Sequence, residues 1–263
     1  MKTFLTLALV LVVLGAAAPQ TGPDWYQAGK AAQAAGRLDE AAADYAKALV
    51  LGFPKAYVAY RMATLRILQH DNAGAIAELQ KATGPSGLPG DSLATDPALA
   101  PIAKDPAFLA YVAGQQRAFH PCKYDAAYRA LDFWAGDWTV TNPLNATVGK
   151  SHVERIVDDC VIFENWTDIY GGTGKSFTSY DVALHRWDQH WVDSVGTVTE
   201  YVGSVKDGAV VLVATSPTGL AQMTFARLPG GKVRQSFENS TDGGKTWTPG
   251  ADLTYTPAVA AKP

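Results

Sequence analysis

Acidic, aromatic and amide side chains recur at every second position in the C-terminal half of this 263-residue chain. Alternate residues of a β-strand share one face, so each run would present its side chains together. If these faces point into an interior, they predict a small-molecule site in which apolar walls bind and a few polar groups orient the ligand. If they point to solvent, the same residues form exposed cross-strand pairs. The sets are Glu164, Trp166 and Asp168; Ser176, Thr178 and Tyr180; Trp187, Gln189, Trp191 and Asp193; and Arg234, Ser236 and Glu238.

The tryptophans favour the inward orientation, because burying Trp166 and Trp191 removes a large apolar area from water. We therefore predict an aromatic cavity for a small apolar or aromatic ligand. A filled barrel is the open alternative: its charged residues would pair with one another, for instance Glu164 or Glu238 with Arg234, and leave no room for a ligand. The predicted ligand-binding residues are Trp166, Tyr180, Gln189, Trp191 and Arg234.

The carboxylates on the same faces could also serve acid–base catalysis. Glu164, Asp193 and Glu238 are the candidates for a general acid or base acting on a bound ligand. The sequence has no Gly-x-Ser-x-Gly motif, which a hydrolase of the nucleophile-elbow type requires. We therefore expect a binding protein rather than an enzyme, and these three acids are catalytic candidates only if a reaction is catalysed.

Neither a metal ion nor an organic cofactor is expected. His185 and His190 are five residues apart, so on one strand they point to opposite faces and cannot share a metal. The run Gly174-Lys175-Ser176 imitates the end of a phosphate-binding P-loop. The motif needs an earlier glycine, where Ile169 stands, and a following helix, where the pattern indicates a strand.

Ten short alternating segments between residues 138 and 256 must position these side chains. Turn signals separate them, among them Asp158-Asp159, Gly171-Gly172 and Asp207-Gly208. Antiparallel strands joined by tight turns close most economically into an up-and-down β-barrel, because closure leaves no exposed strand edges.

The first 18 residues have the form of a secretory signal peptide. Lys2 precedes an apolar run from Phe4 to Leu14, and small residues follow at positions 15 to 18. The run is shorter than the ~20 residues needed to span a bilayer, so we expect cleavage and no stable membrane insertion. The mature protein is therefore predicted to be periplasmic or secreted.

Export changes the interpretation of the two cysteines. In an oxidising compartment we predict a disulfide between Cys122 and Cys160, which would close a loop of about forty residues. A catalytic thiol is the alternative, but neither cysteine lies in a CxxC motif.

The composition predicts a globular protein, since 48% of the residues are hydrophobic and 18% are charged. A net charge of −3 without a basic block gives no electrostatic footprint for a polyanion. We therefore expect no nucleic-acid partner.

Residues 24 to 83 resemble two tetratricopeptide repeats, a helical repeat of 34 residues. Tyr45 and Leu79 take equivalent positions between paired helices, and His70 stands where Gly36 marks the turn of the first repeat. A further helix after Asp105-Pro106 would cap the array and end near Phe119. The resemblance implies a protein or peptide partner, and a helical scaffold without one is the open alternative.

The barrel segment carries a more specific resemblance. Gly136-Asp137-Trp138 on the first strand is a lipocalin or calycin type of opening. Together with LDFWAGDWTV, ERIVDDCVIFENW, GGTGKSFTSYD, RWDQHWVDS and STDGGKTW, it resembles a bacterial family of exported lipocalin-like domains of unknown function. The resemblance implies a fold and no reaction.

We therefore expect an α+β protein of two domains. The predicted parts are a signal peptide (1–18), a tetratricopeptide-like helical domain (19–120), a lipocalin-like antiparallel barrel (121–257) and a disordered tail (258–263). The expected function is an exported binding protein, with the helices for protein contact. The alternatives are a small enzyme and a structural adaptor with no ligand.

Overall fold

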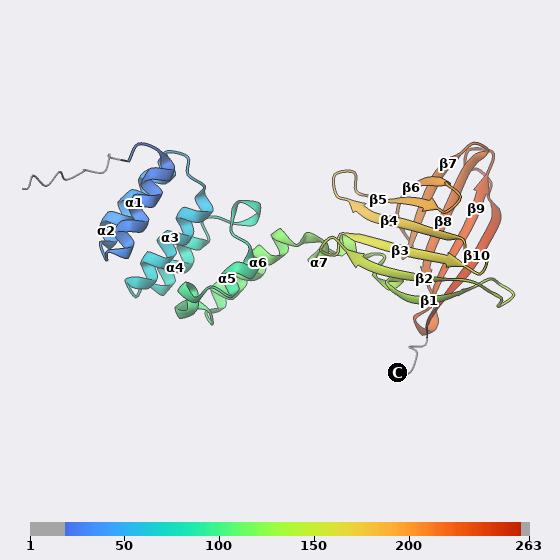
Figure 1. Cartoon of the computed structure of the whole chain (residues 1–263), viewed down its shortest axis with the longest axis horizontal. Helices are drawn as coiled ribbons and strands as arrows, with labels where there is room; N and C mark the ends of the chain where they lie inside the picture. Colours follow the sequence, from blue (N-terminus) through green and yellow to red (C-terminus); the bar gives the residue numbers. More distant parts are fainter. Residues whose placement is uncertain (1–18, 259–263) are drawn as a thin grey trace, which may run out of the picture. The chain divides into compact units, whose positions relative to one another are not determined.

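The computed structural model describes residues 19–258, so the predicted signal peptide and residues 259–263 of the predicted tail lie outside it. The chain divides into two compact units between Phe119 and His120, a helical unit and a β-barrel (Figure 1). In the part of the chain that is described, no helix has both the length and the apolar character needed to cross a membrane.

The helical unit is built on two helix pairs (Figure 1). The first two helices pack on each other, as do the third and fourth. Small residues allow this close approach: a Cβ atom on Gly29 would stand 2.7 Å from the ring of Tyr45, which is fully buried. The four helices are α1 (Gly22–Ala34), α2 (Leu38–Val50), α3 (Lys55–Leu68) and α4 (Asn72–Leu79).

The turns inside the two pairs have the same backbone conformation. Gly36 has a φ of 75° and His70 a φ of 60°. Both values lie in the left-handed region, which suits glycine and strains a residue with a Cβ atom. His70 therefore keeps the turn geometry of Gly36 at a conformational cost.

A third group of helices completes this unit: η1 (Gly84–Ser86), α5 (Gly90–Ala94), η2 (Pro97–Ile102) and α6 (Pro106–Phe119). Asp96 and Asp105 each accept a hydrogen bond from a backbone N–H two residues ahead, at 2.8 Å. Phe108 of α6 is buried in the same core as Leu79 of α4. The predicted capping helix is thus present and ends at Phe119.

The second unit is a closed antiparallel barrel of ten strands. Each strand pairs with its neighbours in sequence, and β1 pairs with β10 to close the ring. The predicted up-and-down barrel is confirmed. Its strands are β1 (Gly136–Thr141), β2 (Thr147–Ile156), β3 (Val161–Asp168), β4 (Thr173–Asp181), β5 (Arg186–Asp193), β6 (Val198–Lys206), β7 (Ala209–Ser216), β8 (Gly219–Arg227), β9 (Val233–Ser240) and β10 (Thr248–Pro257).

Three short helices, α7 (Pro121–Tyr124), η3 (Ala126–Arg129) and η4 (Asp132–Trp134), precede β1. The disulfide between Cys122 of α7 and Cys160, beside β3, ties this segment to the barrel, as predicted. Trp134 is fully buried and its backbone carbonyl accepts a 2.8 Å hydrogen bond from Trp138 Nε1. The two tryptophans fill one part of the barrel interior together with Phe225 and Leu212.

Candidate functional site

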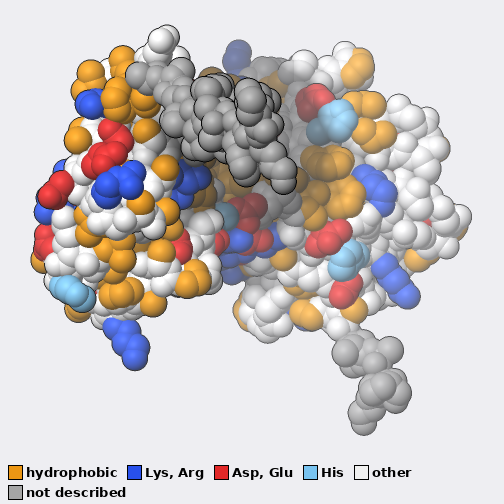
Figure 2. Space-filling view, turned by 60° about the vertical axis from the view of Figure 1, so that its left-hand side comes forward, with side chains coloured by type: hydrophobic (Ala, Val, Ile, Leu, Met, Phe, Trp, Pro, Cys, Tyr) orange, Lys and Arg blue, Asp and Glu red, His pale blue; other side chains and the backbone are white. Residues whose placement is uncertain are grey.

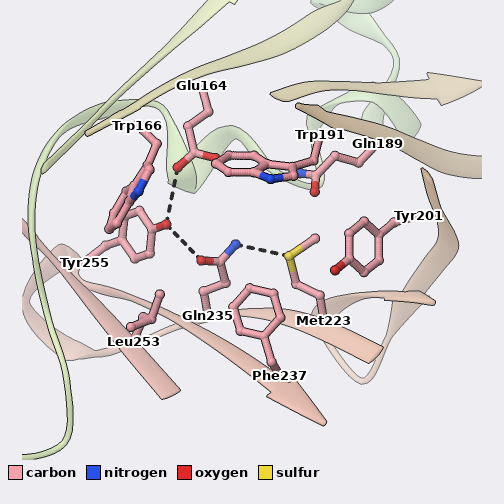
Figure 3. Close-up of a pocket in the computed structure, with 10 residues that line it drawn as sticks. All are labelled: Glu164, Trp166, Gln189, Trp191, Tyr201, Met223, Gln235, Phe237, Leu253 and Tyr255. Atoms are coloured by element: carbon pink, nitrogen blue, oxygen red, sulfur yellow. Dashed lines mark hydrogen bonds between the residues drawn. The ribbon is translucent and has the colours of Figure 1, made fainter. Parts of the chain in front are cut away.

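Part of the barrel interior is a cavity of about 250 Å³ (Figure 3). Its walls come from six strands, β3, β5, β6, β8, β9 and β10. Tyr255 forms the boundary with the filled part, because it lines the cavity and its ring also contacts Trp134 and Trp138. The hollow and the filled interpretations of the sequence therefore each describe one part of the same barrel. The lining residues are Glu164, Trp166, Gln189, Trp191, Tyr201, Met223, Gln235, Phe237, Leu253 and Tyr255.

Two glycines on neighbouring strands hold the tryptophans of the cavity wall. A Cβ atom on Gly174 of β4 would stand 2.1 Å from the Trp191 ring, and one on Gly149 of β2 would stand 2.5 Å from the Trp166 ring. Only a residue without a side chain lets each indole lie this close to the adjacent backbone. The position of each ring is thus fixed by a glycine across the strand pair.

Glu164 is the acid of the cavity and is only 3% exposed. Three hydroxyl groups donate to its carboxylate: Ser151 to Oε1 at 2.8 Å, Ser176 to Oε2 at 3.3 Å and Tyr255 to Oε1 at 3.3 Å. Among the described residues, no lysine, arginine or histidine forms an ion pair with this side chain. A carboxylate without a cation is costly to bury, even where hydroxyl groups solvate it.

The pKa of Glu164 reflects this balance. Burial raises the pKa to about 7, against the opposing effect of the hydrogen bonds from Ser151, Ser176 and Tyr255. Near neutral pH the side chain can therefore either hold or release a proton, which is the property required of a general acid or base.

A chain of hydrogen bonds continues from Glu164 across the cavity (Figure 3). The Tyr255 hydroxyl also lies 2.8 Å from Gln235 Oε1, and Gln235 Nε2 lies 3.1 Å from the sulfur of Met223. Tyr255 has one proton to donate, so when Gln235 accepts it, a protonated Glu164 can donate to the Tyr255 oxygen. Burial raises the pKa of Tyr255 well above its ordinary value, so this hydroxyl stays neutral.

Three of the five predicted ligand-binding residues line this cavity: Trp166, Gln189 and Trp191. Tyr180 lies elsewhere, against the rings of Tyr128 and Trp187. The fifth, Arg234, does not line the cavity either.

The orientation predicted for Arg234 and Glu238 is wrong. On β9 the alternate residues Gln235 and Phe237 line the cavity, so Arg234 and Glu238 belong to the opposite face. There Arg234 donates two hydrogen bonds to Asp252, and Glu238 accepts one from Gln222. The physical reason is that this register leaves Arg234 exposed to solvent and turns the apolar ring of Phe237 toward the cavity.

Of the three candidate acids, the structure places only Glu164 in the cavity. Asp193 stands at the end of β5 and accepts backbone hydrogen bonds from Val195 and Thr197 in the following turn. These bonds hold the pKa of Asp193 below its ordinary value. Glu238 lies outside the cavity, on the opposite face of β9.

The prediction missed six residues of the site: Tyr201, Met223, Gln235, Phe237, Leu253 and Tyr255. The sequence of β9 contained a signal for its inner face. Every second residue there, Val233, Gln235 and Phe237, is apolar or an uncharged amide.

The described residues include no group of three or more His, Cys, Asp or Glu side chains that could hold a metal ion.

The exterior carries no single-sign field on the face drawn in Figure 2. Among the described residues visible there, Lys and Arg side chains are interspersed with acidic and apolar ones.

The comparisons with known proteins do not identify the family of this chain. No model of a known protein family matches the chain, and a search of curated proteins finds no match either.

Proposed function

We propose that this chain is an exported, lipocalin-like binding protein whose barrel holds a small apolar or aromatic molecule. The observation that carries the proposal is the cavity itself, in which Trp166, Trp191, Tyr201 and Phe237 supply aromatic walls. Glu164 adds a carboxyl group. Apolar walls with a few polar groups are the usual composition of a small-molecule site.

The volume of the cavity limits the size of the ligand. Pockets for drug-sized ligands run from ~300 to ~1,000 Å³, and this cavity is somewhat smaller at about 250 Å³. The site therefore suits a molecule of one or two rings.

Export is supported by the disulfide between Cys122 and Cys160, since such bonds persist in oxidising compartments.

Ligand titration of the full mature chain tests the proposal. We expect 2-phenylethanol, or another member of a panel of one- and two-ring aromatic compounds, to change the tryptophan emission saturably. Leu253→Phe fills the cavity and should abolish the change. Leu144→Phe makes the same substitution at a site that is 86% exposed and should have no effect. A panel without saturable binding, or equal binding by Leu253→Phe, would overturn the proposal.

The position of Glu164 supports a second candidate function, general acid–base catalysis on the bound molecule. A carboxyl group with a pKa of about 7 inside a ligand cavity is suited to it. The test is the exchange of the α-protons of 1-phenylpropan-2-one in D₂O, followed by NMR. Catalysed exchange that Glu164→Gln abolishes would support an enzyme; exchange at the uncatalysed rate would count against it.

For the helical unit we propose two tetratricopeptide-type repeats that contact a protein or peptide. The equivalent turns at Gly36 and His70 and the packing of Gly29 on Tyr45 support this assignment. A groove between α2, α3 and α4 is bordered by Lys55 and Lys81. Cross-linking in the intact cell should join these two lysines to one recurrent partner peptide, whereas cross-links no more frequent than those of Lys104 would contradict the proposal.

A further inference from the structure

We infer that the ligand of the barrel is an alkylamine that carries an aromatic ring, bound in its protonated form with its ammonium group against Glu164. The inference rests on the proposed binding function and names the class of molecule that the cavity selects. Its basis is a buried carboxylate, set in an aromatic cavity, to which residues 19–258 offer no cation (Figure 3).

Glu164 differs in this respect from the other buried acids. Among the described residues, three carboxylates are buried: Asp44, Glu78 and Glu164. Asp44 has Lys47 at 3.9 Å, and Glu78 has Lys81 at 2.6 Å. Glu164 has hydroxyl donors only. The barrel therefore leaves one negative charge that a bound cation can neutralise.

The cavity walls suit a cation as well as a ring. Trp166, Trp191, Tyr201 and Phe237 present π-systems, and a desolvated cation near such faces is stabilised by their quadrupoles. Gln189 donates its amide N–H to Thr178 at 2.8 Å, so its carbonyl oxygen remains as a second acceptor for an ammonium group. In Figure 3 the Trp191 ring is drawn between Glu164 and Gln189, and Phe237 lies on the opposite side of the cavity.

The charge of the cavity excludes an acidic ligand. Among the described residues its lining contains no lysine, arginine or histidine, so a ligand carboxylate would meet Glu164 without a counter-charge. The other titratable groups of the lining are Tyr201 and Tyr255, and burial raises the pKa of both phenols, which therefore stay neutral. Glu164 alone sets the charge of this site.

Protonation of Glu164 then competes with the ligand. Burial raises the pKa of Glu164 to about 7 in the protein without ligand. Below that pH an ammonium ligand must therefore displace the proton from the Glu164 carboxyl group. The affinity for an amine should fall about eightfold as the pH is lowered from one-half unit above that pKa to one unit below it. The affinity for a neutral ring compound should stay constant over the same range.

Calorimetry with two probes of matched shape tests the inference on the full mature chain. Phenethylamine is protonated at neutral pH, and 2-phenylethanol carries a hydroxyl group in place of the ammonium. We expect the wild type to bind the amine at least about tenfold more tightly than the alcohol. Glu164→Gln should remove that preference. Glu200→Gln, which removes an exposed carboxylate paired with His190, should change neither value.

The outcomes separate this inference from the proposed function. If the wild type binds the alcohol as tightly as the amine at every pH, the cavity binds ligands but not as a cation site, and the inference is overturned. If it binds neither probe nor any compound of the aromatic panel, the proposed function fails, and the inference with it. The comparison of the two probes and its pH profile use the wild type alone, so the test does not depend on the folding of Glu164→Gln.

Discussion

The Trp191 indole lies over Gly174 on the neighbouring strand, so closely that a Cβ atom on Gly174 would stand 2.1 Å from the ring's Cη2 atom. Trp166 of β3 and Gly149 of β2 form the same arrangement. Each glycine removes the obstacle that any other residue would place beneath the ring. The shape of the cavity wall therefore depends on residues that do not themselves line it.

Gly174→Ala should displace Trp191 and destabilise the barrel by about 1 to 3 kcal/mol, as overpacking of a well-packed interior does. The binding of 2-phenylethanol should weaken in the same variant. Urea unfolding followed by tryptophan emission measures the first effect, and titration measures the second. Gly114→Ala is the control, because a Cβ atom there would meet no other atom within 4 Å. Equal effects of the two substitutions would contradict this explanation.

The stability of the barrel should fall between about pH 4.5 and 7 because of Glu164. Its pKa in the folded protein, about 7, is raised above the ordinary 4.5, so the folded state binds more protons than the unfolded state in this window. The stabilising contribution is complete below pH 4.5 and is lost as the pH rises through 7. By linkage the loss amounts to about 3 kcal/mol.

Glu164→Gln isolates this contribution, since a glutamine does not titrate. The free energy of unfolding of the wild type, relative to the variant, should decrease across that window and stay level above it. A relative free energy that is flat, or that rises with pH, would show that the pKa of Glu164 is not raised in the folded protein.

Loss of the disulfide should destabilise the barrel by about 3 to 4 kcal/mol, because the bond restricts a loop between residues 38 positions apart in the unfolded chain. The double variant Cys122→Ala/Cys160→Ala tests this in urea. Trp25 is the one tryptophan outside the barrel, so the emission reports mainly on the barrel. The same midpoint with and without the bond would mean that other contacts hold α7 in place.

The two left-handed turns of the helical unit should respond oppositely to substitution. His70→Gly relieves a strained φ of 60° and should stabilise this unit by up to about 1 kcal/mol. Gly36→Ala introduces the same strain and should destabilise it by about 1 kcal/mol. Thermal unfolding followed by circular dichroism compares them. Shifts of the same sign would show that backbone strain at these two turns does not determine the response.

Local pattern was sufficient to predict much of the architecture. Alternation and turn residues predicted ten strands and their closure, because the period of a strand and the conformation of a turn are set by nearby residues. The pairing of Cys122 with Cys160 followed from there being only two cysteines. On β3 and β5 the sequence also identified Trp166, Gln189 and Trp191, since the large apolar area of a tryptophan favours the inner face of its strand.

Only the tertiary structure decided which side chains meet. A strand with period two has two candidate faces, and on β9 the choice between Arg234 with Glu238 and Gln235 with Phe237 depends on the register against β8 and β10. The contact of Tyr255 with Glu164 joins residues 91 positions apart, which no local pattern encodes. Within residues 19–258 Glu164 has no cationic partner, and this is likewise a property of the closed barrel, because it depends on which side chains the neighbouring strands place inside.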